Sequence, residues 1–120
     1  MSLNRGNLGF SIQIGAGVTA AVYTVGSAQT AYIKSVLLHN LSSSGTQNVK
    51  IHVVQNSGGS AGTANTTTQI ARIGISTDDT FFFEPAYPIT LSSNGDTLQV
   101  YNEGTTTNSV NVLVLGDKEV

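Results

Sequence analysis

Residues 48–55, with the sequence NVKIHVVQ, alternate apolar and polar side chains. Val49, Ile51 and Val53 fall on one face of an extended chain, because successive side chains of a β-strand point to opposite faces. The residues between them are polar or charged up to position 52. A period of two, built largely from β-branched residues, predicts a strand with one buried and one solvated face.

Short β-branched and aromatic runs recur along the chain, whereas apolar residues at helical spacing are scarce. Stretches rich in Gly, Ser, Asn and Asp separate the runs and have the composition of turns. The expected strands are residues 10–14, 18–25, 31–40, 48–55, 69–75, 80–84, 89–91, 97–101 and 109–115. About eight or nine short strands joined by polar turns predict an all-β, single-domain antiparallel β-sandwich of jelly-roll-like arrangement.

The length of the chain, 120 residues, is that of one domain. A domain of this size buries roughly two-thirds of the surface of its unfolded chain, so it can fold without a disulfide or a metal, and the chain contains no cysteine. We expect the sandwich to occupy residues 10–120. Residues 1–9 show no apolar period, and we expect an N-terminal arm that either frays or orders only against a neighbouring molecule.

The surface is polar but carries little charge. Charged residues make up 10% of the chain, and the formal net charge is -2. Such a surface has no basic field to neutralise phosphates, so we expect no nucleic-acid partner. No apolar run approaches the about 20 residues of a membrane-spanning helix, and residues 1–21 lack the apolar run of a signal peptide. We therefore expect no membrane partner either.

No pattern in the chain predicts catalysis, a cofactor or a metal centre. His39 and His52 are the only histidines, and neither of their strands contains an Asp or Glu to complete a metal site. The Gly-x-Ser-x-Gly turn of many hydrolases is absent, and the glycines of residues 58–62 lack the Lys of a phosphate loop. Asp78 and Asp79 leave a calcium site open as an alternative, if another loop supplies oxygen ligands. We expect no enzyme, catalytic residue, cofactor or metal ligand.

Three strands place apolar groups on both faces. They contain Leu37-Leu38, Phe81-Phe82-Phe83 and Val112-Leu113-Val114-Leu115. A two-layer sandwich encloses only one face of each sheet, so the other must lie under a loop or arm, under a second copy, or under a different protein. We favour an assembly contact, because a chain of this length has little spare backbone. The residues of this hypothetical interface are Phe82, Leu3, Leu8 and Leu38.

Several segments resemble those of small structural proteins of tailed bacteriophages. They are YIKSVLLHN (residues 32–40), VKIHVV (49–54), GGSAGTAN (58–65), EPAYPI (84–89), GDTL (95–98) and VNVLVLG (110–116). In that group the order is strand, Asn-Ser turn, strand, Gly-Ser-Ala-Gly loop, strand, and then an apolar strand. The resemblance covers residues 31–120. It implies a β-sandwich virion component, with no family active site to carry over.

Two classes of function follow. The first is a capsid decoration (cement) protein, a homo-oligomer and most specifically a trimer, which binds between major capsid subunits and stabilises the head. Its location would be the virion, assembled in the host cytoplasm, and a tail, neck or fibre component is the alternative. The second is a glycan-binding jelly roll. Such sites stack sugars on aromatic rings, and the chain has no Trp and offers only Tyr23, Tyr32, Tyr87 and Tyr101.

Overall fold

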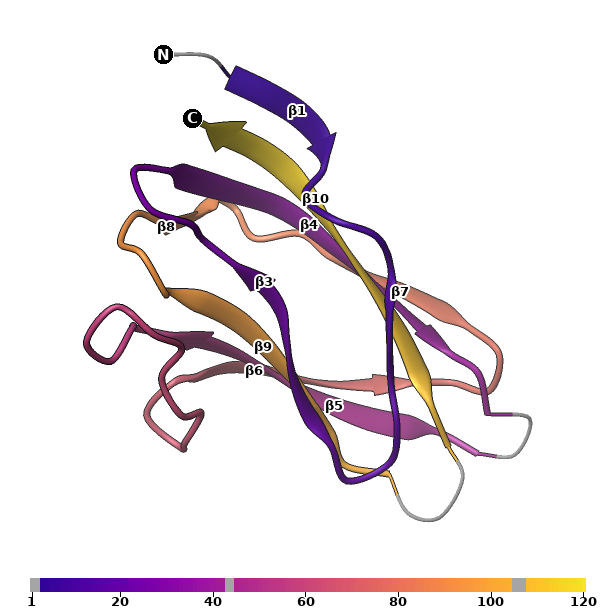
Figure 1. Cartoon of the computed structure of the whole chain (residues 1–120). Helices are drawn as coiled ribbons and strands as arrows, with labels where there is room; N and C mark the ends of the chain where they lie inside the picture. The colour runs from indigo at the N-terminus through magenta and orange to yellow at the C-terminus, as the bar shows by residue number, and fades with distance from the viewer. Residues whose placement is uncertain (1–2, 43–44, 105–107) are drawn as a thin grey trace.

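The computed structural model describes residues 3–42, 45–104 and 108–120, and within them the chain forms ten β-strands in two antiparallel sheets (Figure 1). The strands are β1 (Leu3–Asn7), β2 (Ile12–Ile14), β3 (Thr19–Thr24), β4 (Thr30–Asn40), β5 (Gln47–Val54), β6 (Gln69–Ile75), β7 (Thr80–Phe83), β8 (Ile89–Leu91), β9 (Thr97–Asn102) and β10 (Val110–Glu119). The predicted all-β sandwich is confirmed. The sequence predicted eight or nine strands, and the structure has ten.

The strand order is that of a jelly roll. Sheet A contains β1, β10, β4 and β7 in that order, with β2 also beside β10 and β8 also beside β4. Sheet B contains β3, β9, β5 and β6. The pairs are nested: β5 pairs with β6, β4 with β7 and β8, β3 with β9, and β10 with β1 and β2. One long hairpin, folded over into two layers, gives this pairing.

The core lies between the sheets and consists of aliphatic side chains. Val49 and Ile51 of β5 are fully buried in it, as are Leu98 and Val100 of β9. Val53 is partly buried and packs against the same cluster. The inward-facing positions predicted for β5 are therefore confirmed, but the predicted solvated face is buried at His52 and at Val54. Each aliphatic side chain of the core contributes on the order of 1.5–3 kcal/mol through its removal from water.

A β-bulge lets β4 keep one face toward the core along its whole length. The register between β4 and β10 shifts at Gly116. Ala31 and Ile33 are buried on one side of the shift, and Val36 and Leu38 on the other, although a regular strand would turn these two pairs to opposite faces. A Cβ on Gly116 would lie 2.0 Å from a backbone oxygen of β4. Only glycine fits at this close approach.

Buried amides close one end of the sandwich. Asn102 is fully buried, and its Nδ2 donates to the carbonyl oxygens of Ile14 and Asn108, each at 3.0 Å. Its Oδ1 accepts from the Gly104 amide at 2.9 Å and from the Gln47 side chain. One side chain thus joins β9, β5, the end of β2 and the segment before β10. Within the described residues, no buried side-chain nitrogen or oxygen lacks a hydrogen bond.

The N-terminal segment is a strand where the sequence predicted an arm. Leu3 to Asn7 form β1, which pairs with β10 from Leu3 opposite Glu119 to Asn7 opposite Leu115. The expectation that residues 1–9 contain no strand was wrong for β1, because residues 3–6 are exposed and an exposed strand needs no apolar alternation. Residues 1–2 lie outside the described part, and the domain boundary at residue 9 stays a prediction. The ends β1 and β10 lie side by side in Figure 1.

The connection between β5 and β6 packs on the outer face of sheet B. Gln99 Nε2 donates to the Gly62 carbonyl oxygen at 3.0 Å, and His52 Nδ1 lies 2.9 Å from Thr68 Oγ1. Val54, on the outer face of β5, is 2% exposed because the connection covers it. The chain itself therefore covers part of this face.

Asp96 holds the start of that connection to the turn before β9. Its Oδ1 accepts from the backbone N and from Nδ2 of Asn56, at 2.8 and 2.9 Å, and its Oδ2 accepts from the Ser93 amide at 3.1 Å. Burial raises the pKa of the Asp96 carboxyl. The hydrogen bonds from Asn56 and from the backbone of Ser93 and Ser92 outweigh that effect, so the pKa lies below its ordinary value.

We expect Asn102→Ala to lower the free energy of unfolding by about 3 kcal/mol, because it leaves several buried backbone groups without partners. Urea denaturation at neutral pH measures the change. Asn4→Ala, the same substitution at an exposed position of β1, should stay within about 0.5 kcal/mol of the unchanged protein. A loss below about 1 kcal/mol for Asn102→Ala would contradict the role given to this side chain.

Asp96→Asn should reduce stability at about pH 7 by about 1–2 kcal/mol, because an amide oxygen replaces a charged acceptor. The folded-state pKa of Asp96 lies below the unfolded value. The carboxylate therefore stabilises fully above the unfolded pKa, and this contribution disappears as the pH falls through the folded pKa. Urea curves of both proteins should diverge at about pH 7 and converge at about pH 2. An equal difference at both pH values would contradict the assignment.

Candidate functional site

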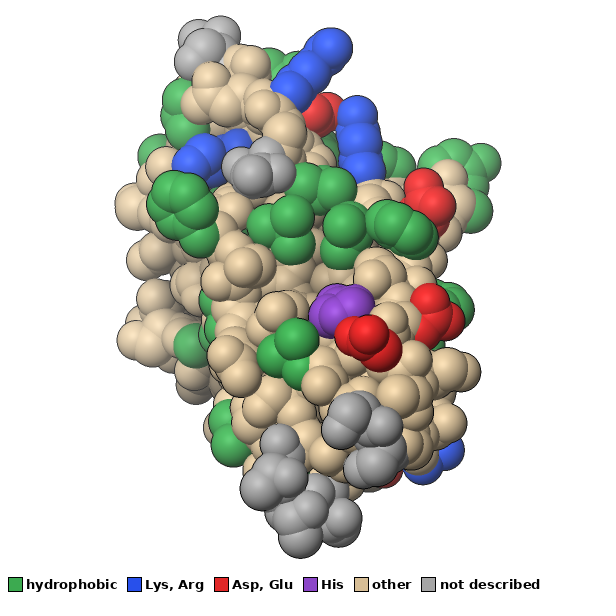
Figure 2. All heavy atoms as spheres, turned by 90° about the vertical axis from the view of Figure 1, so that its right-hand side faces the viewer, with side chains coloured by type: hydrophobic (Ala, Val, Ile, Leu, Met, Phe, Trp, Pro, Cys, Tyr) green, Lys and Arg blue, Asp and Glu red, His purple; other side chains and the backbone are tan. Residues whose placement is uncertain are grey.

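An apolar row crosses the outer face of sheet A. Phe82 of β7 lies opposite Leu37 of β4, and Leu37 lies opposite Leu113 of β10. Phe82 is 56% exposed, and the two leucines are half-buried. We name these three residues the apolar strip. Figure 2, which views the right-hand side of Figure 1, shows hydrophobic side chains gathered in a band on that side of the molecule.

Polar groups border the apolar strip at both ends of the strands. On one side His39 Nδ1 lies 2.8 Å from Thr80 Oγ1, and His39 Nε2 lies 3.4 Å from Asp78 Oδ1. On the other side Lys34 Nζ lies 2.7 Å from Asp117 Oδ2. Figure 2 shows most of the visible Lys and Arg side chains beyond one margin of the hydrophobic band, and a His with neighbouring acidic side chains beyond the other. An apolar centre with a polar rim is the usual anatomy of a protein–protein contact.

A small pocket opens beside the apolar strip. It has a volume of about 190 Å³, and Leu37, Leu113, His39 and Thr80 are among the residues that line it. β7 is also at the end of the strand path of sheet A, and its Phe81 is 41% exposed. Short edge strands of this kind are places where a second chain can approach the sheet. An exposed aromatic ring next to a pocket is a suitable contact point for side chains that a partner inserts into the pocket.

The four residues of the predicted interface do not lie together. Leu38 is fully buried in the core, so its assignment to a surface was wrong. The bulge in β4 turns the even-numbered side chains after it inward, and Leu37 is the one that faces outward. Leu3 lies on β1 and is 45% exposed, whereas Leu8 packs partly against the core. Of the four, Phe82 alone belongs to the apolar strip. The sequence showed apolar pairs, but only the strand register places Leu113 beside Leu37.

The two histidines lie on different sheets. His39 is on the outer face of sheet A, and His52 is on the outer face of sheet B. The structure therefore does not bring them together. In the described part of the chain, no group of three His, Asp or Glu side chains could hold a metal ion. No helix of the described residues is long and apolar enough to cross a membrane.

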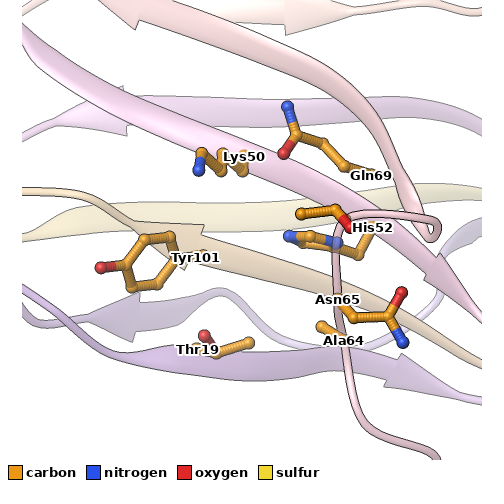
Figure 3. Close-up of a pocket in the computed structure, with 8 residues that line it drawn as sticks. Thr19, Lys50, His52, Ala64, Asn65, Gln69 and Tyr101 are labelled. Atoms are coloured by element: carbon orange, nitrogen blue, oxygen red, sulfur yellow. The ribbon is translucent and has the colours of Figure 1, made fainter.

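A second pocket, of about 230 Å³, lies on the outer face of sheet B (Figure 3). Lys50 and His52 of β5, Tyr101 of β9 and Gln69 of β6 line it. The β5–β6 connection forms one wall, at Asn65. Tyr101 was one of the four tyrosines that the sequence offered for stacking. The pocket itself was not predicted, because it depends on where the long connection packs.

No protein-family model matches the chain, and no characterised protein matches its sequence. Among solved structures, the chain is similar to a structure of infectious bursal disease virus, Gt strain, with 8% sequence identity and a TM-score of 0.38. The match covers 98% of this chain and 32% of the viral chain, so this chain spans about a third of the length of that one. At these values the similarity carries no argument about function.

Proposed function

We propose that the protein is a non-enzymatic structural component of a virus particle. More specifically, we propose a capsid decoration (cement) protein that binds between subunits of the major capsid protein and stabilises the head. The observation that carries this proposal is the apolar strip, an exposed apolar surface on a domain whose described residues leave no buried side-chain nitrogen or oxygen without a hydrogen bond. The resemblance to phage structural proteins supports a location in the virion. The jelly-roll topology, which capsid domains share, supports the same location by analogy of fold.

The apolar strip favours a docked state over an exposed one. Burial of an exposed Phe side chain contributes on the order of 1.5–3 kcal/mol, and the two adjacent leucines add to this when a partner covers them. The strip itself contains no charged group, so docking removes little charge from water. Contacts of this size are weak singly, and their repetition over a shell makes the total large.

Among the described residues, the rest of the chain leaves Phe82 of the strip largely exposed. The long β5–β6 connection packs on sheet B, and β1 lies at the opposite edge of sheet A from β7. In the described residues no segment crosses the strip, whose Phe82 remains 56% exposed. We therefore propose that a second copy or a different virion protein covers it. A homo-trimer at local three-fold positions of the capsid would place one such strip at each contact.

Phe82→Asp should leave the domain folded, since this side chain lies outside the core, and should lower occupancy on particles at least tenfold. A tenfold loss corresponds to about 1.4 kcal/mol per site. The assay adds purified protein to particles of the encoding virus that were produced without it, and co-sedimentation quantifies the bound copies. Ile70→Asp is the matched control, because Ile70 is 48% exposed on β6 of sheet B.

Circular dichroism checks that both variants are folded. Normal occupancy of folded Phe82→Asp protein would refute the contact assigned to the apolar strip. The number of copies that the unchanged protein reaches also separates the alternatives: hundreds per particle indicate the shell, and about a dozen or fewer indicate a tail, neck or fibre position.

A further inference from the structure

The pocket on sheet B contains an imidazole whose tautomer can be worked out. Thr68 Oγ1 donates its single proton to the Asn65 carbonyl oxygen, at 2.9 Å. The ring nitrogen Nδ1 of His52, 2.9 Å from the same Thr68 oxygen, must therefore be the donor in that contact. In the neutral ring Nε2 then carries a lone pair and can accept a hydrogen bond. The ring also forms a hydrogen bond with the Asn65 backbone.

Burial keeps this imidazole in its neutral form. Desolvation, the largest effect, lowers the pKa of His52. The hydrogen bond to the Asn65 backbone raises it by less, and the charge of Lys50 has the smallest effect and lowers it. The net pKa lies below the ordinary value of 6.5. At neutral pH the ring is therefore uncharged, and Nε2 acts as an acceptor.

Tyr101 supplies an aromatic surface next to this acceptor. Its ring is half-buried and lines the pocket, and Figure 3 shows Tyr101 and His52 on neighbouring strands, where Tyr101 pairs with Lys50 and His52 with Gln99. The Lys50 ammonium lies 5.9 Å from the ring centroid, at the margin of the pocket. Aromatic rings that line a polar pocket bind flat apolar faces of a ligand, such as the C–H face of a sugar ring.

One carboxylate partly neutralises two cations near the pocket, which leaves one net positive charge. Lys50 Nζ lies 3.8 Å from Glu103 Oε1, and Arg72 Nε lies 2.8 Å from Glu103 Oε2. One carboxylate therefore lies between two cations, and the imidazole adds no charge at neutral pH. Both cations contact Glu103, so neither is left without a counter-charge. It leaves an ammonium donor, an amide of Gln69, a hydroxyl of Thr19 and an imidazole acceptor around one aromatic ring.

We propose that this pocket binds a neutral sugar unit of a glycan, with the ring stacked on Tyr101 and one hydroxyl donating to Nε2 of His52. Sugar hydroxyls both donate and accept, so they match the mixture of donors and acceptors around the ring. The volume of about 230 Å³ has room for roughly one hexose ring, and it is small for a drug-sized ligand. Because sheet B faces away from the apolar strip, the pocket stays open when the strip is covered.

An array of neutral and sialylated oligosaccharides tests the proposal with the full chain. Saturable binding to at least one neutral glycan is expected, and that glycan is then titrated by calorimetry. Tyr101→Ala should weaken binding at least tenfold, whereas Tyr101→Phe, which keeps the ring face, should stay within about threefold. Phe82→Asp should bind normally, so the outcome does not depend on the proposed role in assembly.

A second variant tests the pocket independently of any folding defect that Tyr101→Ala causes. Thr19 is exposed and lines the pocket, so Thr19→Arg should fill the pocket and abolish binding without touching the core. Thr24→Arg, at an exposed position of the same strand outside the pocket, should bind normally. The proposal is overturned if no neutral glycan shows saturable binding, or if binding survives Thr19→Arg. Binding confined to sialylated glycans or to inorganic phosphate would also overturn it.

Discussion

A sandwich of two sheets has two outer faces, and in the described residues the long β5–β6 connection packs on the outer face of sheet B alone. The β5–β6 connection packs on sheet B, where Val54 is nearly inaccessible and Gln99 hydrogen-bonds to Gly62. On sheet A the row formed by Phe82, Leu37 and Leu113 stays open to solvent. The uneven cover of the two faces is the basis of the proposed assembly, because an exposed apolar row gains free energy when a partner buries it.

The jelly roll gives the two outer faces separate surroundings. Its nested pairing fixes which strands share a sheet, and the buried amide of Asn102 ties together segments from both sheets at one end. Sheet A presents an apolar row with a polar rim. Sheet B presents a polar pocket around Tyr101 and a neutral His52. A docked particle protein with one face against the shell would keep the other free for a soluble or cell-surface ligand.

Local patterns in the sequence predicted what local forces decide. The inward-facing apolar positions of β5 follow from side-chain direction along a strand, and the turn-rich intervals mark most strand ends. Features that depend on distant register were missed. The bulge in β4 exchanged the roles of Leu37 and Leu38, and β1 is exposed, so it carries no apolar signal. The pocket at His52 was missed because it forms only where the β5–β6 connection packs on sheet B, and that connection has no apolar periodicity in the sequence.

The most direct test measures whether a partner covers the apolar strip in the assembled particle. The chain has no cysteine, so Leu37→Cys introduces a single thiol within the strip, and Ile70→Cys provides a comparison on sheet B. Both variants are treated with a thiol reagent, free in solution and bound to particles. The account predicts that particle binding slows modification of the thiol at position 37 at least tenfold, about 1.4 kcal/mol, and leaves position 70 unchanged. Equal rates for the thiol at position 37 in both states would contradict it.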